Sequence, residues 1–217
     1  MEVNSLNKVV VSMRITGIEE QKKNNKRCSI YVDDEYYCSV DKDILEELSL
    51  SEGTQLNEDE FNNIIEAIQY KSALRTALYM LARASKTEKE IKNRLAEKQY
   101  PEKTIIQVLR YLREINYIND EIYTESFIRS MRELAGVSRR SLYYKLAAKG
   151  IDNDIIQQML DEAEIDDYDS ALKTARKKAA GMAGSRKEKA LKLFSYLYRK
   201  GFGMEICRKV IDELDLE

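Results

Sequence analysis

The first 56 residues place apolar and polar side chains in the alternation that is typical of half-buried β-strands. The first such stretch puts apolar side chains on one face, at Val11, Met13 and Ile15. Two β-prone runs, 28–32 and 36–40, flank the polar segment 33–35 and predict a hairpin. A short helix is expected over 41–48, with Asp41 as its N-terminal cap. Residues 1–56 are therefore predicted to form a small β-containing head.

From residue 57 the apolar positions follow a helical period. Asn57 stands three residues before Glu60, which is the spacing of a capping box. An apolar series at helical spacing then follows at Phe61, Ile64, Ile65 and Ile68. We expect a connecting helix over 57–71 that can continue to Leu81.

The rest of the chain repeats itself every 51 residues. Segments of six residues that begin at Leu95, Leu146 and Leu197 each carry a lysine at their fourth position. Apolar residues on both sides keep the same spacing: Ile91, Leu142 and Leu193; Ile105, Ile156 and Cys207; Val108, Met159 and Val210; Leu109, Leu160 and Ile211. Agreement at core-type positions predicts three copies of one unit.

Each copy is expected to hold three helices. In the second copy they are predicted over 121–134, 139–149 and 153–162, with Gly136 and Gly150 as stops. Thr87, and Ser138 51 residues later, can cap the second helix of their copies, and Asn119 or Asp120 can cap a first helix. The third copy departs from this pattern, because Lys189 stands at the expected cap and Ser185 replaces it.

A single three-helix unit buries little apolar surface, so neighbouring copies must stack. The predicted fold is mainly α: three tandem three-helix repeats in an elongated, curved array, behind a small N-terminal head that contains a β-hairpin. The expected boundaries are 1–56 for the head, 57–71 for the connecting helix, and 72–118, 119–165 and 166–217 for the three repeats.

Charge is distributed unevenly along the chain. Residues 1–70 carry 7 Lys/Arg and 15 Asp/Glu, whereas residues 71–217 carry 29 and 23. Two basic clusters within the repeats are candidates for contact with phosphate or with an acidic protein groove. The candidate binding residues are Arg129, Arg132, Arg139, Arg140, Lys145, Lys149, Lys177, Lys178, Arg186, Lys187, Lys189, Lys192, Arg199 and Lys200.

The fourteen tyrosines could stack on nucleic-acid bases, but helical spacing favours core or corner packing. That expectation covers Tyr79, Tyr111, Tyr117, Tyr123, Tyr143, Tyr144 and Tyr196.

Several classes of protein are disfavoured by what the sequence lacks. It has no histidine, no phosphate-binding glycine motif and no nucleophile elbow, so we expect no enzyme, cofactor or metal site. Its three cysteines, Cys28, Cys38 and Cys207, have no metal-ligand spacing, and the first two are expected to be strand residues. Without a signal peptide or a long apolar run, the expected location is the cytoplasm and no membrane partner is expected.

The ordered motifs of the repeats resemble the RecX family of bacterial recombination regulators. The residues that carry the resemblance include 77–83, 87–91, 95–100, 108–112, 116–121, 127–128, Gly136 and 146–151. The resemblance is strong over 72–162 and weaker over 163–217, and the head is similar to the N-terminal extension of Gram-positive members.

The resemblance implies a protein that lies in the groove of the RecA–DNA filament and mostly inhibits ATP hydrolysis, strand exchange and filament growth. It implies RecA as the partner, with single- or double-stranded DNA as a further one, and we expect a monomer. Two alternatives are an independent DNA-binding regulator with helix-turn-helix-like repeats and a plain helical scaffold. The DNA-binding regulator would bind duplex DNA tightly without RecA, and the plain scaffold would bind neither DNA nor RecA.

Overall fold

The computed structural model describes residues 12–22, 24–132 and 136–214. The described chain divides into two compact units. The first contains the residues up to Ala84 together with Lys92–Glu114, and the second contains Ser85–Ile91 together with the residues from Ile115 onward.

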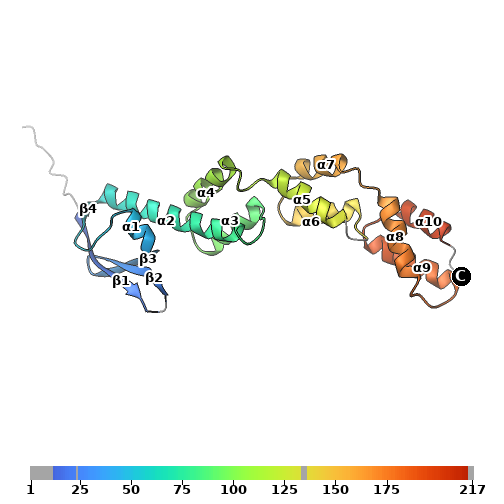
Figure 1. The fold of residues 1–217 in the computed structure, drawn as a ribbon, viewed down its shortest axis with the longest axis horizontal. Coiled ribbons are helices and arrows are strands. Elements are labelled where there is room, and N and C mark those ends of the chain that lie inside the picture. Colours follow the sequence, from blue (N-terminus) through green and yellow to red (C-terminus); the bar gives the residue numbers. More distant parts are fainter. Residues whose placement is uncertain (1–11, 23, 133–135, 215–217) are drawn as a thin grey trace, which may run out of the picture. The chain divides into compact units, whose positions relative to one another are not determined.

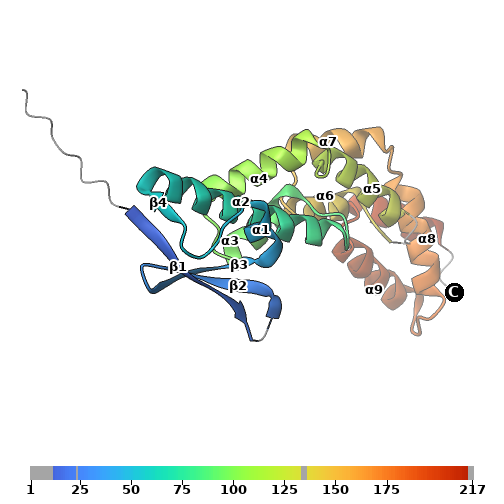
Figure 2. The same cartoon turned by 60° about the vertical axis from the view of Figure 1, so that its left-hand side comes forward.

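The head is a four-stranded antiparallel sheet in the order β3-β2-β1-β4. Its strands are β1 (Ser12–Gln21), β2 (Asn24–Val32), β3 (Glu35–Asp41) and β4 (Gln55–Asn57). The predicted hairpin is confirmed, because Val32 pairs with Glu35 and Cys28 pairs with Val40 across β2 and β3. Figures 1 and 2 show α1 (Lys42–Glu47) and the start of α2 (Glu58–Leu81) on one side of this sheet.

The head core forms where the sheet meets these two helices. It includes Ile15, Ile30, Val40, Ile44 and Phe61, all buried. The period-two expectation for the first strand is therefore confirmed at Met13 and Ile15, whereas Val11 lies outside the described residues. Cys28 and Cys38 are free strand residues, as expected.

Asp41 stands at the N-cap of α1, but its carboxylate accepts no capping hydrogen bond. Its Oδ2 instead lies 3.0 Å from Nη1 of Arg75 on α2. The prediction that the Asp41 carboxylate caps α1 is therefore wrong, because this carboxylate pairs with Arg75 on the neighbouring helix. Asn57 and Glu60 do form the predicted capping box at the start of α2.

The three-helix repeats are confirmed. Repeat 1 combines the end of α2 with α3 (Glu88–Glu97) and α4 (Glu102–Glu114). Repeat 2 consists of α5 (Asp120–Arg132), α6 (Arg139–Ala148) and α7 (Asn153–Glu162). Repeat 3 consists of α8 (Asp167–Ala179), α9 (Arg186–Arg199) and α10 (Met204–Glu213) (Figure 1).

Most of the residues at 51-residue spacing are buried, and Met159 and Ile211 are half-buried. Ile91, Leu142 and Leu193 are all inaccessible to solvent, as are Leu95, Leu146 and Leu197. The residues that close the turn between the second and third helices, Ile151 and Phe202, are buried as well. No helix in the described part of the chain is long and apolar enough to cross a membrane.

The prediction for the tyrosines is wrong at four of seven positions. Tyr79, Tyr117 and Tyr144 are nearly 60% exposed, and Tyr111 is 40% exposed. Of these seven, Tyr123, Tyr143 and Tyr196 are half-buried. Two of the exposed rings lie beside a cation of their own helix region, Tyr79 beside Arg83 and Tyr144 beside Arg140.

Candidate protein and nucleic-acid interface

Repeats 2 and 3 are joined by one side chain that has two roles. Ser138 caps α6 by accepting a hydrogen bond from the amide of Ser141 over 3.1 Å. Its hydroxyl also donates a hydrogen bond of 2.9 Å to the main-chain carbonyl of Lys200, at the end of α9. A second bond runs from the amide of Arg139 to the carboxylate of Asp167, at the start of α8. These contacts tie the start of α6 to two helices of the next repeat.

The close approach at this joint requires glycine. Gly201 follows Lys200 with φ +95°, a backbone conformation that other residues adopt only with strain. A Cβ atom at this position would lie 2.6 Å from Oγ of Ser138. Glycine at position 201 therefore allows both the positive φ of the turn and the close approach of Ser138.

The same joint occurs 51 residues earlier, within the second unit. Thr87 accepts a hydrogen bond from the amide of Glu90 and donates one of 2.9 Å to the carbonyl of Lys149. The amide of Glu88 donates to the carboxylate of Asp120 over 3.1 Å. Gly150 has φ +85°, and a Cβ there would collide with the side chain of Lys89.

The ammonium group of Lys149 is half-buried at this joint. It lies 2.9 Å from a carboxylate oxygen of Glu90 and 5.5 Å from the ring centre of Tyr123. Hydrogen bonds with Tyr123 and Glu90 raise the pKa of Lys149. Burial opposes ionisation of Glu90, but hydrogen bonds from Lys149 and from the amide of Thr87 lower its pKa. Lys149 therefore has a structural role that its charge alone did not reveal.

The clearest basic surface follows one face of α9. Spacings of three, four and three residues place one set of side chains on the same side of this helix. We call this set the α9 stripe: Lys189, Lys192, Tyr196 and Arg199. Two lysines from other turns flank its tyrosine, because Nζ of Lys178 lies 5.4 Å and Nζ of Lys200 5.8 Å from the Tyr196 ring centre. The structure thus brings the end of α8 and the end of α9 together around one ring.

A smaller surface of similar chemistry lies on α6. Tyr144 is exposed, and the guanidinium of Arg140 lies 5.7 Å from its ring centre. Tyr143 meets Tyr144 edge to face at 5.6 Å between centroids. Lys145 is exposed on the same helix. Aromatic rings with adjacent cations can stack on single-stranded bases or cover a protein groove.

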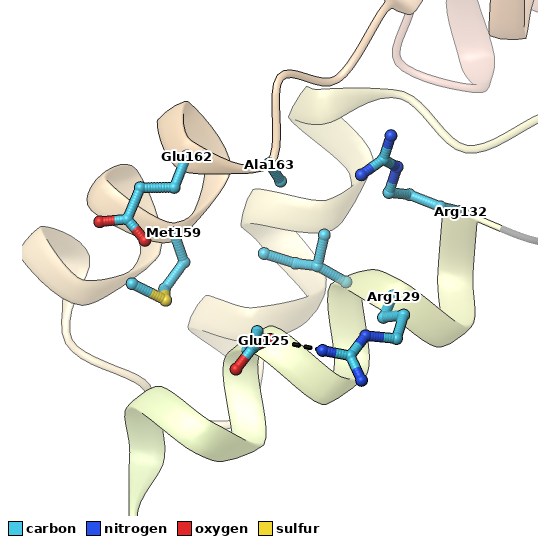
Figure 3. A pocket seen from close by; sticks show the side chains of 7 residues that line it. Glu125, Arg129, Arg132, Met159, Glu162 and Ala163 are labelled. Carbon is cyan, nitrogen blue, oxygen red and sulfur yellow. Dashed lines mark hydrogen bonds and ion pairs between the residues drawn. The ribbon is translucent and has the colours of Figure 1, made fainter.

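Arg129 and Arg132 line a pocket of about 290 Å³ between α5 and α7 (Figure 3). Ile128, Met159 and Ala163 supply apolar wall, and Glu125 and Glu162 supply carboxylates. Arg129 is paired with Glu125 along α5, whereas Arg132 and Glu162 stand on opposite helices with no bond between them. With two arginines and two glutamates, this pocket has no net preference for an anion.

Family models match almost the whole described chain. The RecX N-terminal domain matches residues 13–57, and the first, second and third RecX three-helix domains match 73–112, 119–160 and 164–211. A regulatory protein RecX of Clostridium perfringens strain 13 is 30% identical over 205 residues, which is 93% of this chain and 96% of the relative. The chain belongs to the RecX family.

Further relatives agree with this assignment. A regulatory protein RecX of Clostridium acetobutylicum is 32% identical over 206 residues, or 92% of this chain and 95% of the relative. A crystal structure of a regulatory protein RecX matches with a TM-score of 0.64 at 27% identity, covering 93% of this chain and all of the other. The RecX structure from Lactobacillus salivarius matches with a TM-score of 0.61 at 27% identity, covering 69% and 98%.

Two of the candidate residues make contacts between elements of the RecX repeats. Arg139 donates from Nη1 to the carbonyl of Leu160 over 3.0 Å and pairs with Asp161 on α7. Lys149 pairs with Glu90 at the joint as described, whereas exposed Arg199 donates from Nε to the carbonyl of Ser195 on its own helix. Lys177, Arg186 and Lys187 are exposed at helix ends of repeat 3 and are not part of the α9 stripe.

The sequence reasoning missed the two features of this RecX chain that most shape its surface. One is the joint, because a serine or threonine before a helix is already explained by capping. The other is the exposed tyrosines beside cations, and their signal was present as Arg140 four residues before Tyr144 on one helix face. Within the described residues, no cluster of acidic or cysteine side chains could hold a metal ion.

Proposed function

We propose that this RecX protein binds the RecA–DNA filament and restrains it, by lowering ATP hydrolysis, strand exchange and filament growth. The family assignment and the resemblance support RecA as the partner. The sequence has no histidine and no catalytic motif, so the proposed regulation of RecA works by stoichiometric binding and not by catalysis.

The α9 stripe is the observation that carries the proposal. Lys192 and Arg199 stand on one face with Tyr196, and Lys178 and Lys200 add positive charge beside the ring. A basic surface of this kind is attracted by the phosphate backbone and by acidic walls of a nucleoprotein groove. The remaining candidate contacts are on repeat 2 and on the helix ends of repeat 3: Arg129, Arg132, Arg140, Lys145, Lys177, Arg186 and Lys187.

The test is the steady-state ATPase rate of RecA on single-stranded DNA, with the protein added from substoichiometric to equimolar amounts. We expect a dose-dependent fall in the rate. A stripe variant, Lys192→Gln with Arg199→Gln, should require about tenfold more protein for the same effect, because two charge-assisted contacts are removed.

A matched control removes the same charge from the same repeat outside the stripe. Lys173→Gln with Arg208→Gln replaces an exposed lysine on α8 and an exposed arginine on α10. The control should act like the unchanged protein. An unchanged RecA rate at equimolar protein would refute the proposal, and equal loss in both variants would refute the role of the stripe.

One alternative has its own structural support. Tyr144 beside Arg140, and Tyr196 between two lysines, are suited to stacking on bases without any protein partner. An independent DNA-binding regulator would bind a duplex tightly, in a salt-sensitive manner and with a preferred sequence, in the absence of RecA.

A further inference from the structure

The first unit contains a pocket that is separate from the basic surfaces of the second. It lies between β3, α2 and the turn from α3 to α4, and its volume is about 440 Å³. Ile65 and Ile68 on α2 give it an apolar wall. This size and composition fit the usual range of small-ligand sites, which is about 300–1,000 Å³ with mostly apolar walls.

The charge of the pocket is opposite to that of the head around it. Two cations line it, Arg27 from β2 and Lys98 from the end of α3, and no carboxylate does. Arg27 pairs with Asp41, whose Oδ1 lies 3.8 Å from Nε, and Asp41 also pairs with Arg75 over 3.0 Å. Nη2 of Arg27 donates to the main-chain carbonyl of Ser39 over 3.0 Å, which holds the guanidinium at the pocket. The pocket therefore presents positive charge in a segment where acidic residues outnumber basic ones two to one.

Two tyrosine rings also line the pocket and are held by their own contacts. Tyr37 is 45% exposed and meets Phe61 edge to face at 4.9 Å between centroids. The hydroxyl of Tyr100 lies 3.4 Å from the hydroxyl of Thr76. Rings that are already positioned lose little conformational freedom when a planar ligand packs on them.

Polar groups that could recognise the edge of a planar ligand face the same space. Gln69 and Ser72 line the pocket from α2, and neither side chain hydrogen-bonds to another described residue. An amide offers both a donor and an acceptor, which is the pairing that nucleobase edges require.

We propose that this pocket binds a nucleotide, with the base against Tyr37 and Tyr100 and the phosphate at Arg27 and Lys98. Aromatic wall, amide and paired cations together fit a nucleoside phosphate better than a plain anion or a plain apolar ligand. The nucleotide can be free in solution or one unit of single-stranded DNA. This inference does not depend on the proposed function, because it uses no residue of the second unit.

Cys38 provides a direct readout. It lines the pocket and is half-buried, whereas Cys28 and Cys207 are buried. Burial raises the pKa of the Cys38 thiol, so labelling with a maleimide is measured at mildly alkaline pH. Mass spectrometry of peptides gives the labelling rate of each cysteine with millimolar dTMP, dAMP, thymidine, inorganic phosphate or a 5′-phosphorylated oligothymidylate.

We expect at least one nucleotide or the oligonucleotide to slow labelling of Cys38 about tenfold, with thymidine and phosphate much less effective. Protection by dTMP or dAMP identifies a free nucleotide, and protection by the oligonucleotide alone identifies a unit of single-stranded DNA. The absence of protection by all of these probes would overturn the proposal, as would equal protection by phosphate alone.

Variants test the assignment of the pocket residues. Lys98→Gln and Tyr100→Leu should each weaken protection about tenfold, from loss of a charged contact and of stacking respectively. Lys103→Gln, which breaks an exposed pair with Glu66 outside the pocket, should leave protection unchanged. Thermal melting confirms that each variant is folded, and equal loss in the control would exclude this pocket as the site.

Discussion

The hydroxyl of Ser138 donates a hydrogen bond of 2.9 Å to the carbonyl of Lys200, 62 residues away, while it caps its own helix. Thr87 and Lys149 are related in the same way over the same 62 residues. One hydroxyl group thus caps the start of one helix and donates a hydrogen bond to the end of another. Serine and threonine can both make these two bonds, and they occur at positions 138 and 87.

Removing this hydroxyl should destabilise the second unit more than the loss of an ordinary cap. Ser138→Ala leaves the amide of Ser141 and the carbonyl of Lys200 without this partner, for a loss of about 2–4 kcal/mol in the free energy of unfolding. Ser185→Ala removes a capping box that makes no such second bond and should cost about 1 kcal/mol. Urea titrations measure both. Ser138→Thr should retain stability, and equal losses in the two alanine variants would disprove the dual role.

Substitutions at the equivalent turn positions 99 and 201 should change the free energy of unfolding in opposite directions. Gly201→Ala introduces a Cβ 2.6 Å from Ser138 at φ +95° and should destabilise by about 2 kcal/mol or more. Gln99, the equivalent residue of repeat 1, is exposed with φ +63°. Gln99→Gly relieves its backbone strain and should stabilise by up to about 1 kcal/mol. Thermal denaturation decides, and destabilisation by Gln99→Gly would contradict this account.

The pair at Lys149 should make stability depend on pH in the acidic range. The pKa of Glu90 is lower in the folded chain than in the unfolded one, so its carboxylate stabilises the fold above the unfolded pKa. This contribution is lost as the pH falls through the folded pKa. Glu90→Gln should therefore be less stable than the parent by about 1 kcal/mol at pH 7, and the difference should disappear once the pH is below the folded pKa of Glu90.

The control for this prediction is Glu97→Gln, which removes an exposed glutamate paired with Arg94. It should change unfolding by less than about 0.5 kcal/mol at either pH. A pH-independent loss in Glu90→Gln would show that shape, and not charge, is what Glu90 contributes.

Salt dependence distinguishes direct DNA contact from contact with RecA protein. If Lys192 and Arg199 neutralise phosphates of single-stranded DNA, their replacement by glutamine should reduce the slope of log affinity against log salt by about 0.7 for each contact. Fluorescence anisotropy with a labelled oligonucleotide measures this slope without RecA. An unchanged slope, together with lost RecA inhibition, would assign the α9 stripe to the protein surface of the filament.

The sequence was sufficient to predict the repeats because the same positions are buried in each copy. Leu142 and Leu193 are buried since each sits on the inner face of a middle helix, and the apolar period shows that face directly. Periodicity predicted the tyrosines less well, because adjacent residues point about 100° apart around a helix and only Tyr143 of this pair lies toward the core. Tyr143 is half-buried and Tyr144 exposed.

Contacts between repeats could not be predicted from local patterns. Asn119 caps α5 as expected, since its side chain accepts from the amides of Glu121 and Ile122. The neighbouring Asp120 looked like an equivalent cap, but it accepts from the amide of Glu88 in the preceding repeat. Asn119 thus makes a local capping bond and Asp120 a long-range one. The two residues look alike in the sequence, and only the tertiary structure distinguishes their roles. The basic residues of the α9 stripe, by contrast, were predicted as part of a basic cluster, although Tyr196 between them was expected to pack in the core or at a corner.

The joint also gives the series of repeats a direction. Each bond runs from a hydroxyl of one copy to the main-chain carbonyl at the end of the middle helix of the next copy: Thr87 of repeat 1 donates to Lys149 of repeat 2, and Ser138 of repeat 2 donates to Lys200 of repeat 3. Repeat 2 therefore offers a donor to one neighbour and an acceptor to the other. A copy inserted into the series would need both of these halves to continue it.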